Sequence, residues 1–377
     1  LRVPGRTPSE RLAETQRAFS GETSHGRKPG EMNQQTGVMP IPMTPPAPEI
    51  SVVMPCFNAA ETLEAAIESI RNQSFREWEL LIVDDGSRDA TPGLAEAAAA
   101  MDPRLRLVRQ AHGGIVRALQ TGCALARAPF IARMDADDLA LPERLAKQYA
   151  YMEEHPDTAL CGTHVCMFGA RIGEGRARYE EWLNGLRSHD DIVRELFIEC
   201  PVPHPAFFLR REAFERAGGY EDHGWAEDYD LCMRLFLDGA RFGVVPEPLL
   251  RWRESPGRLS MTAERYSLAR FRALKRFYLA RSYLRGRTRF HQWGAGEVGK
   301  LWLREWEPLQ PEAVVDIHPR KIGRAIHGTP VIAPDDLPAP QTTFIVIAVG
   351  APGAREEIRA WLKPRGYAEL RDFLFVA

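Results

Sequence analysis

The 377-residue chain lacks paired cysteines, a long apolar segment and any sizeable net charge. Its six cysteines include no CxxC pair, so we expect reduced, buried thiols rather than disulfides or a zinc site. No apolar segment is long enough to form a transmembrane helix, and the N-terminus has no apolar signal core. A net charge of −2 gives no reason to expect nucleic-acid binding. We therefore expect a cytoplasmic protein.

Composition divides the chain into four parts. Residues 1–48 are polar and rich in Pro and Gly, which predicts a disordered arm. Residues 49–260 alternate apolar and amphipathic segments. Residues 261–287 are strongly basic, and residues 288–377 contain a second strand-helix-strand pattern. We predict two α/β domains, 49–260 and 288–377, joined by a basic helix.

The pattern of residues 49–260 predicts strands joined by helices. Expected strands are 50–54, 78–83, 105–108, 130–134, 160–168, 206–209 and 242–245; expected helices are 60–72, 91–100, 115–126, 142–154, 190–199, 211–217 and 227–237. Near-continuous apolar strands separated by helices are typical of a parallel, doubly wound sheet. The pattern becomes less regular after residue 168.

Acidic residues follow the apolar strand 130–134. Alternation along an extended segment would place Asp135 and Asp137 on the same side, in the crevice where open α/β sheets bind ligands. Two carboxylates there suit a hard divalent cation that also holds a diphosphate. The alternative is that these acids only cap the helix that starts near Pro142.

Other strand ends carry further candidates. Asp85, after the second strand, could accept a hydrogen bond from a base or a ribose hydroxyl. The alternative is a plain turn, with Ser87 or Asp89 as the cap of the next helix. Asn58 could cap the helix near residue 60, with the backbone beside it facing a nucleotide. The glycine pair that ends at Gly114 would let a diphosphate approach backbone N–H groups.

Acidic residues also occupy the first turn of the helix expected over 227–237. They could complement the helix dipole, or one of them could act as general base on an acceptor hydroxyl. Downstream, Arg251 and Arg253 offer positive charge for a leaving diphosphate.

In this order the segments resemble family 2 glycosyltransferases of the GT-A fold. The matching segments are Val53–Asn58, Val83–Ser87, Arg133–Asp138, His204-Pro205, Gly218–Tyr220 and Glu227–Leu231. The resemblance covers roughly residues 50–260 and implies a doubly wound mixed sheet. It also implies inverting transfer of a hexosyl or N-acetylhexosaminyl group from a nucleotide-sugar, with a UDP-sugar favoured. The expected acceptor is a cell-surface polysaccharide, a lipopolysaccharide or a lipid-linked precursor.

The resemblance also implies roles for single residues. Asp135 and Asp137 bind Mn²⁺ or Mg²⁺ and the donor, with Asp138 adjacent, and Asp228 is the catalytic base, with Glu227 beside it. The other implied donor contacts are Pro55, Asn58, Asp85, Gly114, Arg133 and Arg253. Glu254 stands where the family often has His, so Arg251 remains an alternative to Arg253.

Two other functions fit parts of this pattern. A sugar nucleotidyltransferase would carry a Gly-rich loop with Arg or Lys directly after the first strand, and residues 56–60 do not provide one. A non-catalytic nucleotide-sugar-binding protein would bind the donor without turnover. The complete set of Asp135, Asp137 and Asp228 argues against it.

The last part of the chain carries a GxGxxG motif. Gly294, Gly296 and Gly299 follow an apolar segment and open a helix, and Asp316 ends a strand roughly twenty residues later, as in dinucleotide-binding folds. The region resembles the small Rossmann-like domain of bacterial sugar acyltransferases, which implies a second nucleotide-sugar site at these residues. A dinucleotide site and a purely structural role remain open.

Basic and aromatic residues are mixed over 263–287, where we expect one long helix. We expect it to pack its aromatics between the two domains. The alternative is peripheral association with the anionic inner face of the membrane.

Overall fold

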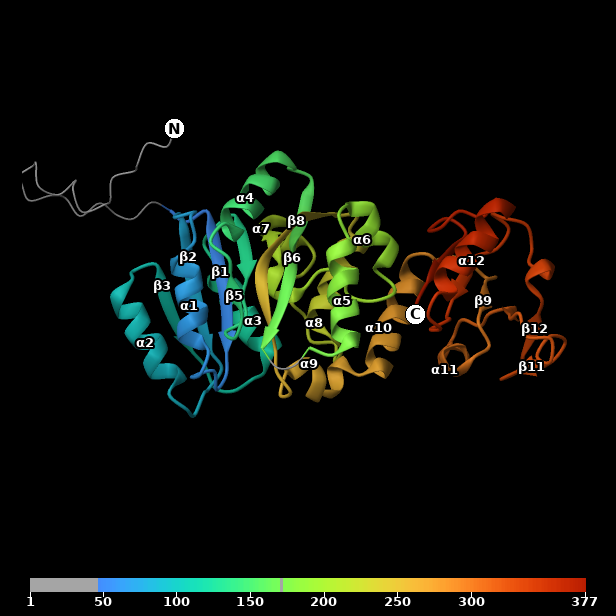
Figure 1. The fold of residues 1–377 in the computed structure, drawn as a ribbon, viewed down its shortest axis with the longest axis horizontal. Helices are drawn as coiled ribbons and strands as arrows, with labels where there is room; N and C mark the ends of the chain where they lie inside the picture. The colour runs from blue at the N-terminus through green and yellow to red at the C-terminus, as the bar shows by residue number, and fades with distance from the viewer. Residues whose placement is uncertain (1–46, 170–171) are drawn as a thin grey trace, which may run out of the picture. The chain divides into compact units, whose positions relative to one another are not determined.

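The computed structural model describes residues 47–169 and 172–377, so the predicted arm 1–48 lies almost entirely outside the described residues. Residues 46–377 form one compact unit. It holds an eight-stranded sheet formed by residues 50–254 and a six-stranded sheet formed by residues 291–375 (Figure 1). The four domain boundaries expected from composition stay predictions.

The larger sheet has the strand order β3-β2-β1-β4-β7-β6-β8-β5. Its strands are β1 (Ile50–Cys56), β2 (Trp78–Asp84), β3 (Leu105–Arg109), β4 (Phe130–Arg133), β5 (Leu139–Ala140), β6 (Thr158–Gly169), β7 (Phe208–Arg210) and β8 (Arg241–Glu254). The first four in this order are parallel, whereas β7 is antiparallel to both β4 and β6. The sheet is therefore mixed, as the resemblance implied, and the wholly parallel sheet expected from the strand pattern is wrong.

Helices cover both faces of this sheet. They are α1 (Leu63–Arg71), α2 (Thr91–Met101), α3 (Ile115–Leu125), α4 (Arg144–Glu154), α5 (Glu174–Gly185), α6 (His189–Glu195), α7 (Arg211–Arg216) and α8 (Glu227–Leu237). Alternation along β1 sends Val52 and Met54 to the apolar cluster that contains the buried residues of α1, while Val53 joins the cluster that contains those of α3. Both faces of the strand are buried, which explains why its sequence is apolar except for Ser51.

Three differences from the predicted elements lie close to the site or change the linker. Helix α5 was not expected, because Leu183 is the only side chain it buries. Strand β8 continues nine residues beyond the predicted end, from Val245 to Glu254. The long helix predicted over 263–287 is wrong: a 3-10 turn, η3 (Glu264–Tyr266), precedes α10 (Leu268–Arg281). Ser267 starts α10 by accepting a hydrogen bond from the N–H of Arg270.

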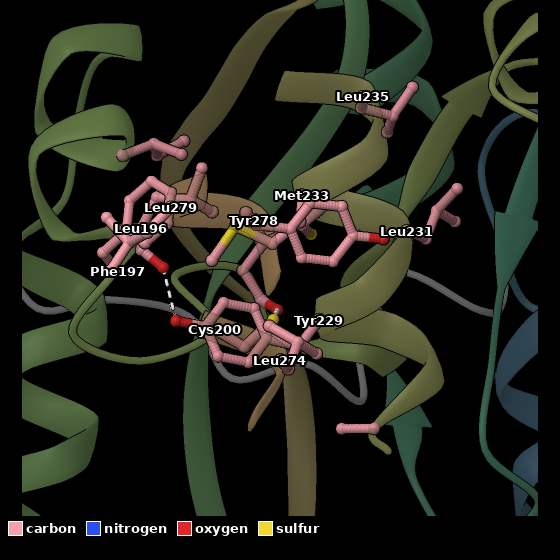
Figure 2. Packing of buried hydrophobic residues seen from close by; sticks show 14 of the residues in the cluster. Leu196, Phe197, Cys200, Tyr229, Leu231, Met233, Leu235, Leu274, Tyr278 and Leu279 are labelled. Carbon is pink, nitrogen blue, oxygen red and sulfur yellow. Dashed lines mark hydrogen bonds between the residues drawn. The ribbon is translucent and has the colours of Figure 1, made fainter. Parts of the chain in front are cut away.

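Helix α10 packs into the core. Leu274, Tyr278 and Leu279 are buried against α8 and the segment after α6 (Figure 2). The hydroxyl of Tyr278 donates to Asp230 of α8. The Nζ of Lys275 donates to the carbonyls of Ile198 and Val376, so this helix joins the segment after α6 to the segment after β14. These contacts fit the linker interpretation, and membrane binding by the basic segment stays a prediction.

The smaller sheet has the order β11-β12-β10-β9-β13-β14. Its elements are β9 (His291–Trp293), α11 (Glu297–Glu305), β10 (Ala313–Val315), β11 (Ala325–Ile326), β12 (Thr329–Ile332), β13 (Ile345–Ile347), α12 (Ala354–Leu362) and β14 (Phe373–Phe375). All strands except β11 are parallel, and β9 lies between β10 and β13. The strand order reverses at β9, which is where open α/β sheets place ligands.

All six cysteines are free, and only Cys166 is exposed. The expectation of reduced thiols stays a prediction, and that of burial is wrong for Cys166. None of the helices in the described part of the chain combines the length and apolarity needed to cross a bilayer.

Candidate active site

A cavity of about 1190 Å³ opens at the carboxyl ends of β1, β2 and β4. Its lining includes most of the segments that the sequence singled out in residues 50–260, although not Gly218–Tyr220: 55–58, Asp85, His112, Gly114, Arg133, 135–137, 204–205, 227–228 and 252–254. These segments lie far apart in the chain. Parallel strands bring their carboxyl ends to one edge of the sheet, which explains why they meet.

Three carboxylates after β4 form a cluster. Ligand oxygens of Asp135, Asp137 and Asp138 lie within 4.8 Å of one another. Asp135 pairs with the Arg133 guanidinium at 2.5 Å. Strand β4 ends at Arg133 and the acids lie in a turn, so the strand alternation used to predict their proximity is wrong, although the proximity itself is confirmed. They do not cap α4, whose N-cap is Glu143.

This cluster fits a divalent cation. Asp138 is fully buried; one of its oxygens accepts from the N–H of Arg253 at 2.6 Å, and Oδ2 has no hydrogen-bond partner among the described residues. Burial, and then the charge of Asp135, raise the pKa of Asp137 to about 6. Crowded carboxylates in a partly buried site favour a positive ion with oxygen ligands, such as Mg²⁺ or Mn²⁺.

Asp85 organises the loop between β3 and α3. Its carboxylate accepts hydrogen bonds from the N–H groups of Gly113 at 2.9 Å and Gly114 at 2.8 Å, and from Gln110 at 2.6 Å. A Cβ on Gly86 would lie 2.8 Å from the nitrogen of His112, so glycine is required for the two loops to approach. The structure thus shows what holds Asp85 at the cavity wall, while its contact with a base or ribose stays a prediction.

Asn58 does not cap α1, whose N-cap is Thr62. Instead, the Asn58 side chain accepts from the N–H of Arg88 at 2.9 Å, and its own N–H donates to Ser87 at 2.8 Å. Asn58 therefore joins the end of β1 to the loop after β2. In that loop Asp89, rather than Ser87, accepts from the N–H of Thr91 at the start of α2.

The two acids that start α8 lie in different surroundings. Glu227 is buried, and both its carboxylate oxygens accept from the Tyr266 hydroxyl, at 2.9 and 2.8 Å. The Arg265 guanidinium lies 3.6 Å from the same carboxylate. Asp228 lines the cavity, where burial and then the charge of Glu227 raise its pKa to about 7. A carboxylate with such a pKa suits general-base chemistry near neutral pH.

Behind these acids lies His204, from the His-Pro motif. Its Nε2 lies 2.8 Å from the Tyr220 hydroxyl, and burial keeps its pKa well below the usual range, so the imidazole is neutral. His204 lines the cavity as an uncharged polar group.

Arg253, and not Arg251, lines the cavity. Its Nε donates to the carbonyl of Asp137 at 2.7 Å, and its guanidinium lies 4.5 Å from the Phe168 ring centre. Sequence reasoning missed Arg258, which lines the same cavity from the loop after β8 and stacks 4.6 Å over Trp252. It also missed Tyr266. Neither residue belongs to a motif, and no spacing rule could have indicated them.

In the smaller sheet the GxGxxG turn and Asp316 do come together. The Asp316 carboxylate accepts from the N–H of Ala295 at 3.0 Å and from Lys321 at 3.0 Å. A Cβ on Gly299 would lie 1.9 Å from the carbonyl oxygen of Gly294, so this glycine lets α11 pack on the turn. Gly294, Gly296, Gly299 and Asp316 are thus placed as a dinucleotide-type turn, and a ligand there stays a prediction.

Comparisons with known proteins agree with the family that these motifs indicate. Residues 51–218 fit the family model described as Glycosyl transferase family 2. EpsE of Bacillus subtilis (strain 168), classed as a glycosyltransferase, is 31% identical over 228 residues, which are 59% of this chain and 78% of EpsE. The amylovoran biosynthesis glycosyltransferase AmsE of Erwinia amylovora is 30% identical over 206 residues, which are 54% of this chain and 75% of AmsE.

Among solved structures, S. aureus TarS 1-349 in complex with UDP-GlcNAc superposes with a TM-score of 0.52. The match covers 62% of this chain and 66% of that structure, at 18% sequence identity. At this identity the likeness concerns the fold alone.

Proposed function

The chain belongs to glycosyl transferase family 2, and from that premise we propose that it transfers a sugar, with inversion, from a nucleotide-diphosphate donor to a glycan hydroxyl. It is a glycosyltransferase with the GT-A fold. The observation that carries the mechanism is that Asp135, Asp137 and Asp228 line one cavity, with the buried Asp138 beside the first two.

The donor diphosphate is assigned to the carboxylate cluster and its arginines. Asp135 and Asp137 would hold Mn²⁺ or Mg²⁺, which acts when bound as a Lewis acid on the diphosphate. Arg133, Arg253 and Arg258 surround the cluster and add positive charge for the leaving group. A UDP-sugar is the favoured donor, and the TarS complex with UDP-GlcNAc supports this choice at the level of a shared fold.

Asp228 is assigned as the general base. The acceptor oxygen forms a bond to the anomeric carbon, and its proton passes to the Asp228 carboxylate. The bond from the anomeric carbon to the diphosphate oxygen breaks, and its electron pair leaves with the diphosphate. Attack from the face opposite the leaving group inverts the anomeric centre. Glu227 is held by Tyr266 and Arg265, so we assign it a positioning role: its negative charge raises the pKa of Asp228.

The acceptor is proposed to be a growing cell-surface polysaccharide or its lipid-linked precursor. The relation to AmsE, an enzyme of amylovoran biosynthesis, supports this class. A cytoplasmic location, with peripheral association at the inner face of the membrane through residues 261–287, belongs to the same proposal. Flotation of the chain with anionic vesicles tests it, and failure to float would remove the membrane component.

A thermal-shift screen tests the donor assignment. UDP-, GDP-, CMP- and dTDP-sugars are compared with and without Mn²⁺ on the wild type, Asp137→Ala, and the control Asp190→Ala, which changes an exposed acid of α6. We expect a shift with one donor class that requires the metal, disappears in Asp137→Ala and persists in Asp190→Ala. A shift that occurs without the metal and is unchanged in Asp137→Ala would contradict the assignment.

A further inference from the structure

A second concave site, of about 420 Å³, lies among α11, the loop after β10 and the β11–β12 hairpin. It shares no lining residue with the active-site cavity. Its lining contains five cationic side chains, one histidine and no carboxylate. These are Lys300, Arg304, Arg320, Lys321, Arg324 and His327. We call this site the basic pocket.

Most of this charge is not neutralised by the protein. Among residues 47–169 and 172–377, no carboxylate forms an ion pair with Lys300, Arg304, Arg320 or Arg324; Lys321 pairs with Asp316 at 3.0 Å. Like charges that converge on one concavity repel each other, so the arrangement is stabilised when an anion binds among them.

Contacts within the protein hold the pocket in shape. Arg304 of α11 donates from Nε to Nε2 of His327 at 3.1 Å, which joins the helix to the hairpin. On the other side, the N–H of Val331 donates to the carbonyl of Arg324 and the N–H of Gly323 donates to the carbonyl of Val331, at 2.7 and 2.9 Å. The loop that carries the cations is thereby fixed to β12. These contacts fix the backbone of the pocket, while the side chains of Lys300, Arg320 and Arg324 are exposed to a ligand.

We propose that the basic pocket binds a ligand that carries two or more phosphate groups. Guanidinium groups pair with phosphate oxygens through two parallel hydrogen bonds, and lysines add point charges. Five cations exceed what one carboxylate ligand would require. The volume falls in the range of small-molecule sites and suits a diphosphate with part of its substituent.

In the smaller sheet, the proposed phosphate contacts lie in the basic pocket and not at the GxGxxG turn. Gly294 and Gly296 do not line the basic pocket. Lys321 connects the basic pocket to the glycine turn, because it lines the pocket and pairs with Asp316. The Asp316 carboxylate in turn accepts a hydrogen bond from the N–H of Ala295. Binding at the basic pocket does not depend on the glycosyl transfer proposed above.

Calorimetric titration of the full chain with inorganic pyrophosphate tests the site. EDTA is present, so that a metal-dependent donor site does not contribute. The variant Lys300→Gln/Arg320→Gln/Arg324→Gln removes three charges from the pocket. The control Arg187→Gln/Arg285→Gln/Lys363→Gln removes the same charges from exposed positions outside both cavities.

We expect the wild type and the control to bind one pyrophosphate, and the pocket variant to bind at least about tenfold more weakly. Absence of binding by the wild type, or equal binding by the pocket variant, would overturn the proposal. Retention of the metal-dependent donor shift in the pocket variant shows that it remains folded, and separates this result from a failure of the donor assignment.

The phosphate source can be a free nucleotide or a lipid headgroup, and two further arms distinguish them. UDP and UDP-sugars are used as competitors of pyrophosphate, and flotation is measured with phosphatidylcholine vesicles with and without a polyprenyl diphosphate. Competition by nucleotides assigns a soluble ligand. Flotation that needs the polyprenyl diphosphate and the three pocket residues assigns a lipid headgroup.

Discussion

Two adjacent acids at the start of α8 carry different chemistry because their neighbours differ. Tyr266 and Arg265 hold the Glu227 carboxylate in a buried site, whereas Asp228 lines the cavity. Burial and the charge of Glu227 then make Asp228 a stronger base than an exposed aspartate. The distinction depends on a tyrosine 39 residues downstream.

Replacing the proposed base should separate chemistry from binding. Asp228→Asn keeps the size of the side chain but accepts no proton, so we expect turnover to fall by about 10²-fold or more while the donor-dependent thermal shift is retained. Initial rates and thermal shifts are measured on the same preparations. Equal loss of donor affinity and turnover would count against the role as base.

The raised pKa predicts the pH profile of the reaction. Asp228 accepts a proton only when ionised, so activity should be low below its pKa of about 7 and rise as the pH increases through that value. The measurement is kcat/KM against pH. A profile that stays flat from pH 5 to about 9 would contradict the assignment.

Tyr266 should tune this profile without touching the reacting atoms. In Tyr266→Phe the Glu227 carboxylate loses hydrogen bonds that lower its pKa, so a larger fraction of Glu227 becomes protonated. The charge that raises the pKa of Asp228 is then reduced, and the rising limb should move to lower pH. Tyr283→Phe, which changes a tyrosine that does not line the cavity, is the control, and it should leave the limb in place. An unchanged limb in Tyr266→Phe would refute the coupling.

Among the elements, α10 shows how tertiary contacts override a regular pattern. A basic, aromatic stretch predicted one helix over 263–287, yet the helix runs only from Leu268 to Arg281. The Tyr266 hydroxyl binds Glu227, which fixes the η3 turn beside the cavity, and Ser267 caps the helix that follows. Tyr278 of α10 packs into the core beside α8 (Figure 2), and Phe271 and Phe277 are partly buried against the same cluster.

The buried lysine of α10 should matter for stability. Burial lowers the pKa of Lys275 to about 8, and its Nζ donates hydrogen bonds to the carbonyls of Ile198 and Val376. Lys275→Met would leave both carbonyls without this donor and should lower the free energy of unfolding by about 1–3 kcal/mol. Urea denaturation measures the change, with the exposed Lys363→Met as the control. A stability equal to that of the control would show that the two hydrogen bonds contribute nothing.

The two sheets share one packed interior. A single apolar cluster contains Val53 and Leu81 of the larger sheet as well as Val346 and Leu374 of the smaller one. Glu195 accepts from Trp182 on one side, and from Arg355 and Arg359 of α12 on the other. The predicted boundary near residue 287 therefore crosses a continuous core.

This shared core predicts cooperative unfolding. Differential scanning calorimetry of the chain should show one transition, because unfolding either sheet would expose apolar surface of the other. Glu195→Gln weakens the ion pairs to α12 and should lower that transition temperature without splitting it. Two resolved transitions in the wild type would instead support independent domains.

The family and the positions of the main acids could be read from the sequence. Strands β1, β2 and β4 are mostly apolar and buried on both faces, and the residues that follow a strand must lie at its carboxyl end. Local pattern alone therefore placed Asp85 and Asp135 at that end of the sheet. Local cues failed for α5 and for the end of β8, where few buried side chains or an irregular pairing register leave no clear period.

The tertiary structure alone decided which groups surround those acids. It turned Asp138 inward to hold Arg253, brought Arg258 and Tyr266 to the cavity, and gathered the cations of the basic pocket from two segments. Such contacts join residues distant in the chain through loops of no fixed period, and they arise only when the whole core packs. The physical reason is that the local sequence determines the conformation of a segment, whereas the electric environment of a side chain depends on neighbours that any part of the chain can supply.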